Sequence, residues 1–170
     1  MPCNALDRPN RLGPPVSSAR IVTSQHRATA NMSNVNIGDR FSREHVFTPQ
    51  QVMDFSLAAG DDNPLHLDAA FASASAYGGL IASGTHTTAI LLGLTASHFS
   101  KITSVVGRRF TVEFRRAVRA DATVIVEWQV MGLTPRATRP GKIVRLEGTL
   151  TDKSSGEVCV AAQGEVVVDL

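Results

Sequence analysis

The sequence predicts an α+β fold in which a long central helix is wrapped by a curved antiparallel sheet. Residues 85–99 carry apolar side chains almost all round a helical wheel, which is typical of a buried helix and not of one on the surface. From residue 104 onward, apolar residues recur at every second position, which is the period of half-buried strands. A helical half followed by a strand-rich half favours a single domain with segregated helices and strands.

The helical half begins with a strand and a capped helix. Residues 39–47 alternate only in part between apolar and polar, so we expect a strand at the edge of the sheet. Thr48 and Pro49 suit the N-cap and first position of a helix, and Gly60 suits its end. A short helical segment rich in Ala and Ser is predicted over residues 68–76.

The second half predicts four antiparallel strands joined as a meander. A polar loop over residues 135–141 and a tight turn over residues 154–156 separate the last three. The four strands are expected over residues 104–115, 123–131, 142–151 and 157–169.

Composition argues against several classes of function. A formal net charge of +2 is too small to argue for nucleic acid. Cys3 and Cys159 offer neither a disulfide framework nor the paired spacing of metal ligands, so no metal site is expected. The longest apolar stretch, residues 87–94, is far short of the roughly 20 residues that span a bilayer, so no membrane partner is expected.

The first 33 residues are predicted to form a leader outside the folded domain of residues 34–170. They are rich in Pro, Asn, Ser and Arg, show no sustained period, and lack the apolar region of a secretory signal. A disordered tail on a cytoplasmic protein is the expectation. Two alternatives stay open: residues 1–31 are a mitochondrial transit peptide, or Met32 is the true start.

One short stretch after the first predicted helix concentrates the chemistry. Asp61 and His66 stand on either side of Asn63 and Pro64. Because proline lacks an N–H and disfavours helical conformation in the residue before it, the chain turns here and the two side chains can face each other. A carboxylate and an imidazole of different pKa suit acid/base chemistry. A solvated Asp and a surface His in a loop that ends the helix fit the spacing equally well.

The motif around this pair resembles the MaoC-like hydratase family, which includes the (R)-specific enoyl-CoA hydratases. The resemblance covers residues 36–169 and rests on the run GDDNPLH at residues 60–66, followed by IASG at residues 81–84 before the long helix. It implies the hot-dog fold. It also implies at least a homodimer, because hot-dog subunits typically pair their sheets edge to edge, which covers exposed strand edges.

The resemblance assigns catalytic roles to three residues. Asp61 and His66 would hold and activate water, and the backbone N–H of Gly84 would polarise a thioester carbonyl. A helix N-terminus presents unpaired N–H groups to an anion, which supports the role of Gly84 independently. The implied reaction is hydration or dehydration of an α,β-unsaturated acyl-CoA or acyl carrier protein thioester in fatty acid metabolism. No cofactor besides the thioester is expected.

Four further residues are candidates for substrate binding. Asn63 would brace the loop, and Ser83 stands where relatives often carry His. His86, two residues into the long helix, is an alternative base or a pocket-lining residue. Arg109 represents a group that could bind coenzyme A phosphates through bidentate guanidinium contacts, the alternative being a solvated strand face and turn. The group consists of Arg108, Arg109, Arg115, Arg116 and Arg119.

Two other functions share the predicted scaffold. A hot-dog thioesterase often brings a carboxylate from the central helix, but residues 85–99 contain neither Asp nor Glu. A non-catalytic acyl-thioester binder, or the silent subunit of a hetero-oligomer, stays open because Ser83 and Leu92 depart from the family pattern. The length and branching of the acyl chain are not specified by the motif.

Overall fold

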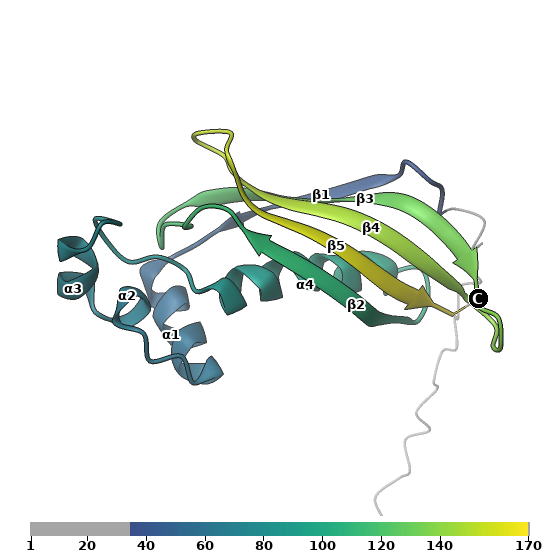
Figure 1. Ribbon diagram of the computed structural model, residues 1–170, viewed down its shortest axis with the longest axis horizontal. Helices are drawn as coiled ribbons and strands as arrows, with labels where there is room; N and C mark the ends of the chain where they lie inside the picture. The colour runs from purple at the N-terminus through teal and green to yellow at the C-terminus, as the bar shows by residue number, and fades with distance from the viewer. Residues whose placement is uncertain (1–34, 170) are drawn as a thin grey trace, which may run out of the picture.

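The computed structural model describes residues 35–169. A five-stranded antiparallel sheet curves over one long helix, α4 (Gly84–Phe99), and three short helices gather at the end where α4 begins (Figure 1). The predicted α+β class, with a central helix under a curved sheet, is confirmed. The predicted leader, residues 1–33, lies outside the described residues.

The strands follow the order β1-β3-β4-β5-β2, so β1 and β2 form the two edges of the sheet. Their bounds are β1 (Arg40–Val46), β2 (Val105–Phe114), β3 (Thr123–Pro135), β4 (Lys142–Asp152) and β5 (Val158–Val168). The predicted meander is wrong for its first strand, because β2 pairs with β5 and not with β3. The strand predicted over residues 123–131 is longer than expected, because β3 continues to pair with β4 beyond a register shift between Val130 and Gly132. Its last residue, Pro135, pairs with Lys142.

The short helices are held by side-chain caps. They are α1 (Pro49–Ala59), α2 (Pro64–Leu67) and α3 (Ala69–Ala74). The Thr48 side chain accepts from the backbone of Gln51 at the start of α1, as the sequence predicts. Asp68 caps α3 by accepting from the N–H groups of Ala70 and Phe71 at 2.8 and 3.0 Å. These helices therefore begin where the sequence supplies an acceptor for their free N–H groups.

One row of residues across the sheet includes the side chain that hydrogen-bonds to α4. Trp128, on β3, is fully buried, and its Nε1–H donates to the carbonyl of Leu91 in α4 at 2.8 Å. A Cβ built on Gly148 would lie 2.4 Å from the indole, so only glycine leaves room for the ring. In register order, the row across the five strands is Phe41, Trp128, Gly148, Ala162 and Val112.

The helix α4 is buried on one side only. Its buried residues, including Leu91, Leu94 and Phe99, face the core under the sheet. The sequence predicts that α4 is buried on almost all sides. This is wrong for the strip that faces away from the sheet, which is exposed in the single chain. This exposed strip consists of small side chains: Thr85, Ala89, Gly93 and Ala96.

Candidate active site

The loop that carries Asp61 is fixed by the end of α1. Gly60 adopts a left-handed conformation (φ 71°), and its N–H is directed at the carbonyls of Leu57 and Ser56. The N–H of Asp61 then donates to the Ser56 carbonyl at 2.9 Å. The Asp61 carboxylate accepts from the N–H of Asn63 at 3.2 Å, which closes a tight turn. Asp61 is therefore held just past the helix.

His66 is positioned by the next helical turn. The Asn63 side chain caps α2 by accepting from the N–H of Leu65 at 3.1 Å. His66 is 6% exposed, and its Nδ1 lies 2.8 Å from the carbonyl of Ile81. A carbonyl can only accept, so Nδ1 carries the proton and Nε2 of the neutral ring is left as an acceptor.

The structure brings Asp61 and His66 together. Oδ2 of Asp61 lies 3.7 Å from Nε2 of His66, beyond the range of a direct hydrogen bond. Two acceptors at this spacing can both receive a hydrogen bond from the same water molecule. The pair can thus orient a water and take a proton from it.

Gly84 supplies an N–H beside this pair. The Ser83 hydroxyl caps α4 by accepting from the N–H of His86 at 3.2 Å, and it shares a hydrogen bond with the Thr85 hydroxyl at 2.9 Å. As the first residue of α4, Gly84 finds no carbonyl within the helix for its own N–H. That donor sits at the positive end of the helix dipole, where a developing negative charge is stabilised.

Two hollows meet at Gly84. One, of about 380 Å³, is lined by His66 together with Thr87 and Arg116. The other, of about 490 Å³, is lined by Asp61 together with small side chains of α4. Gly84 and Phe114 line both hollows. The Asp61–His66 pair and the helix N-terminus therefore share one surface.

Three of the sequence-predicted binding residues lie away from these hollows. Ser83 is buried as the helix cap and lines neither hollow. His86 is also buried, with its ring stacked on Phe55 at 4.3 Å and edge-on to Phe47 at 5.1 Å. Burial lowers the pKa of His86, with a smaller contribution from the charge of His45. Asn63 lies in the loop between the two catalytic candidates and caps α2.

Arg109 is not brought to the pair. It points to the face of the sheet away from α4 and lines a different hollow of about 310 Å³. Arg115 and Arg116, beyond the end of β2, line the hollow that contains His66. They form ion pairs at 2.9 Å with Glu113 and Glu157 respectively.

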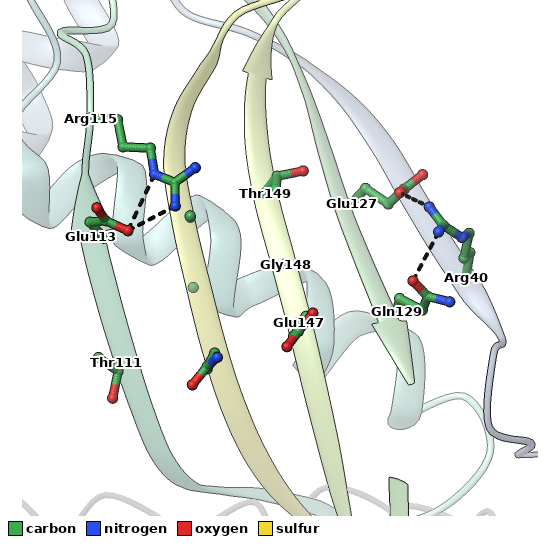
Figure 2. A pocket seen from close by; sticks show the side chains of 12 residues that line it. Arg40, Thr111, Glu113, Arg115, Glu127, Gln129, Glu147, Gly148 and Thr149 are labelled. Atoms are coloured by element: carbon green, nitrogen blue, oxygen red, sulfur yellow. Dashed lines mark hydrogen bonds and ion pairs between the residues drawn. The ribbon is translucent and has the colours of Figure 1, made fainter. Parts of the chain in front are cut away.

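The outer face of the sheet carries a separate polar hollow of about 550 Å³. Figure 2 shows its rims, where Arg40 binds Glu127 at 2.7 Å on one side and Arg115 binds Glu113 at 2.9 Å on the other. Thr149 and other small side chains form part of its floor. Neither Asp61 nor His66 lines this hollow.

Phe114 is a site residue that the sequence analysis missed. Strand alternation places it with Phe110 and Val112 on the core side of β2, yet it is 57% exposed. An apolar side chain at the last position of an edge strand, just before two arginines, was the available signal. Its ring lies on Gly84, where a built Cβ would come within 3.0 Å of Cζ.

Residues 35–169 contain neither a cluster of metal ligands nor a membrane-spanning helix. No group of three or more His, Cys, Asp or Glu side chains there is arranged to hold a metal ion. None of the helices in the same range is long and apolar enough to cross a membrane.

Comparison with known proteins identifies the family. The model of the MaoC like domain matches residues 29–153, well over half of the chain. The chain belongs to the MaoC-like family. A comparison with the sequences of curated proteins found no match.

Solved structures of two (R)-hydratases and of a MaoC-like dehydratase share the fold. R-hydratase PhaJ1 from Pseudomonas aeruginosa superposes with a TM-score of 0.72 and 22% identity, over 81% of this chain and 84% of that one. The (R)-hydratase from A. caviae, described as involved in PHA biosynthesis, gives 0.70 and 23% over 79% and 98%. The MaoC-like dehydratase from Rhodospirillum rubrum gives 0.70 and 29% over 81% and 95%. The predicted resemblance and hot-dog fold are confirmed.

Proposed function

We propose that the chain is a hydratase or dehydratase that adds water to, or removes it from, the double bond of an α,β-unsaturated acyl-CoA. The observation that carries this proposal is the 3.7 Å separation of Asp61 Oδ2 and His66 Nε2 beside the N-terminus of α4. Membership of the MaoC-like family and the fold shared with two (R)-hydratases support it. We also expect the hydroxyacyl product to have the R configuration.

In the hydration direction, the pair would activate water. The hydrogen bond between His66 Nδ1 and Ile81 leaves Nε2 free to accept, and Asp61 accepts from the other hydrogen of the same water. The water oxygen forms a bond to C3 of the substrate as one proton passes to the pair. Coupled groups titrate jointly, so the proton is assigned to the pair and not to either side chain.

Gly84 would stabilise the negative charge that this step creates. Attack at C3 moves electrons onto the thioester oxygen, which becomes an enolate. A donor aimed at that oxygen acts on the transition state more than on the ground state. Delivery of the proton from the pair to C2 restores the thioester and completes the addition, and dehydration is the reverse sequence.

The arginines that line the hollow containing His66 suit a coenzyme A substrate. The side chains of Arg115 and Arg116 are about half exposed in their ion pairs with glutamates. Such exposed pairs contribute only about 0–1 kcal/mol, so either guanidinium can exchange its carboxylate for a phosphate at little cost. An acyl carrier protein thioester, which also carries a phosphate, is the alternative.

A homodimer is the proposed assembly. The edge strand β2 exposes the apolar side chain of Val106 and has no strand partner on its outer side. Pairing two copies along β2 would cover Val106 and remove an open sheet edge. Two structures with the same fold are hetero-complexes, HadBC and ChsH1-ChsH2 from Mycobacterium tuberculosis, so a hetero-oligomer is the alternative.

Hydration of crotonyl-CoA, followed by loss of the enoyl thioester absorbance, tests the proposal on the full chain. Asp61→Asn and His66→Ala should each lower turnover by about 10²- to 10⁴-fold, the usual contribution of a positioned acid or base. Asp62→Asn is the matched control, because it removes the same charge from the exposed neighbouring residue, which lines neither hollow. All three variants should keep the wild-type circular dichroism spectrum.

Two outcomes would overturn the proposal. Hydration that survives in both variants would mean that the pair does not activate water. Release of free thiol, measured in parallel, would mean that the chain is a thioesterase. The absence of Asp and Glu from α4 argues against that second outcome.

A further inference from the structure

We infer that Phe114 is a specificity-determining residue whose ring limits the bulk of the substrate at C2, next to the thioester carbonyl. The inference deepens the proposed function and rests on it for the identity of the ligand as an acyl thioester. It is carried by the contact of Phe114 with Gly84 and by its place between the two hollows.

The ring of Phe114 contacts Gly84. A Cβ built on Gly84 would lie 3.0, 3.2 and 3.4 Å from Cζ, Cε1 and Cε2 of the Phe114 ring. The tip of the ring therefore covers the Cα of the residue whose N–H is the carbonyl donor. N and Cα are about 1.46 Å apart. A thioester oxygen bound to that N–H thus places C1 and C2 next to the ring.

The second step is the position of the ring between the hollows. Phe114 and Gly84 are shared by the hollow that contains His66 and the hollow that contains Asp61. The His66 hollow also contains Arg115 and Arg116, whereas Thr88 and Ala89 line the Asp61 hollow. A thioester that reaches from the arginines to the apolar side of α4 has to pass the edge of Phe114.

The third step is the exposure of the ring. Phe114 is 57% exposed, although it stands on the core side of β2. Large apolar side chains that stay accessible at a concave site are available for contact with a ligand. Removing the ring takes little from the folded core, so a variant at this position reports on binding and not on folding.

The selectivity that an apolar side chain can impose between two substrates is known approximately. One extra or missing methyl group in an apolar site changes specificity by about 10- to 200-fold. The wild-type protein should therefore bind a straight-chain acyl-CoA at least about tenfold more tightly than the same acyl-CoA with a methyl branch at C2. Replacing Phe114 by alanine should bring the two affinities close together.

Calorimetric binding of two saturated thioesters, butanoyl-CoA and 2-methylbutanoyl-CoA, tests this directly. Neither ligand has a double bond, so the measurement does not depend on turnover. The affinity ratio should fall towards one in Phe114→Ala and rise in Phe114→Trp. Phe71→Ala is the matched control, because Phe71 is 52% exposed on α3 and lines none of the described hollows, so this variant should keep the wild-type ratio.

A wild-type ratio near one, or the same ratio in wild type and Phe114→Ala, would overturn the inference. If the ratio changes as expected but crotonyl-CoA is not hydrated, the proposed reaction fails while the role of Phe114 stands. Gly84→Ala gives a second test. Its methyl group should press on the ring and weaken butanoyl-CoA binding, and Phe114→Leu in the same chain should restore part of the loss.

Discussion

Replacing Gly148 with alanine should destabilise the fold, because the new methyl group would occupy space that belongs to Trp128. The built Cβ lies 2.4, 2.5 and 2.7 Å from three atoms of the indole. Ordinary contacts are about 3.5–4.0 Å, so the ring or the strand has to move by about 1 Å. Trp128 is fully buried and hydrogen-bonded to Leu91, so it has no free direction in which to move.

The magnitude follows from two terms. Overpacking a rigid core costs about 1–3 kcal/mol. Displacing the ring from the Leu91 carbonyl removes a hydrogen bond worth about 1 kcal/mol. The free energy of unfolding should therefore fall by about 2–4 kcal/mol, a large fraction of the total stability of a small domain.

Urea unfolding followed by tryptophan fluorescence measures this change at the site itself, since Trp128 is the only tryptophan of the chain. Glu147→Gln is the control, because Glu147 precedes Gly148 on β4 and lines the outer hollow of the sheet, so its replacement should change stability by no more than about 0.5 kcal/mol. Far-UV circular dichroism extends the experiment to Trp128→Leu. In that background, Gly148→Ala should lower the free energy of unfolding by much less than it does in the wild type.

A wild-type urea midpoint for Gly148→Ala would show that the methyl group does not clash with Trp128. The same would follow if Gly148→Ala lowered the free energy of unfolding equally in the wild type and in Trp128→Leu. In either case the indole of Trp128 would not be what excludes a methyl group at position 148.

Three further predictions address the core, the site loop and acid stability. Leu91→Ala, at a fully buried position, should cost about 2–5 kcal/mol in urea unfolding, and a loss below 1 kcal/mol would contradict the packing described. Asn63→Ala should cost about 1 kcal/mol by removing the cap of α2, and it should lower crotonyl-CoA turnover because His66 lies in that turn; unchanged turnover would count against it. Burial lowers the pKa of three imidazoles from the usual 6.5, so they stay neutral in the fold while the unfolded chain binds protons. Stability should therefore be independent of these groups well above pH 6.5 and fall as the pH drops below it, which thermal unfolding from pH 7.5 to 5.5 would show. A flat melting temperature over that range would contradict the assignment to His45, His86 and His98.

The elements of the fold could be predicted because their signals are local. Thr48 and Pro49 begin α1 and Gly60 ends it, as their positions in the sequence indicate. The exposed strip of α4 could not be predicted, because a helical wheel shows which side chains are apolar but not which side the sheet leaves open. The extension of β3 to Pro135 was missed for a related reason: pairing with β4 keeps residues 132–135 in the strand, although Gly132 and Pro135 are typical of a strand end.

The candidate site divides in the same way. The break at Pro64 is enough to predict that Asp61 and His66 can approach each other. The proton on Nδ1 of His66 depends on the carbonyl of Ile81, which the chain reaches only after passing through α3. The sequence offered no means of choosing Arg115 and Arg116 over Arg109, because strand alternation does not show where β2 ends relative to α4.

By itself, the sequence determined the order of helices and strands, the caps that begin them, and the placement of Asp61 and His66 on either side of an Asn-Pro turn. Each of these depends on residues within a few positions of one another. Only the tertiary structure decided that Phe114 covers Gly84, that His86 is buried between Phe47 and Phe55, and that Arg109 faces away from the site. Those contacts depend on strand register and on how the sheet crosses α4, and no local pattern encodes either.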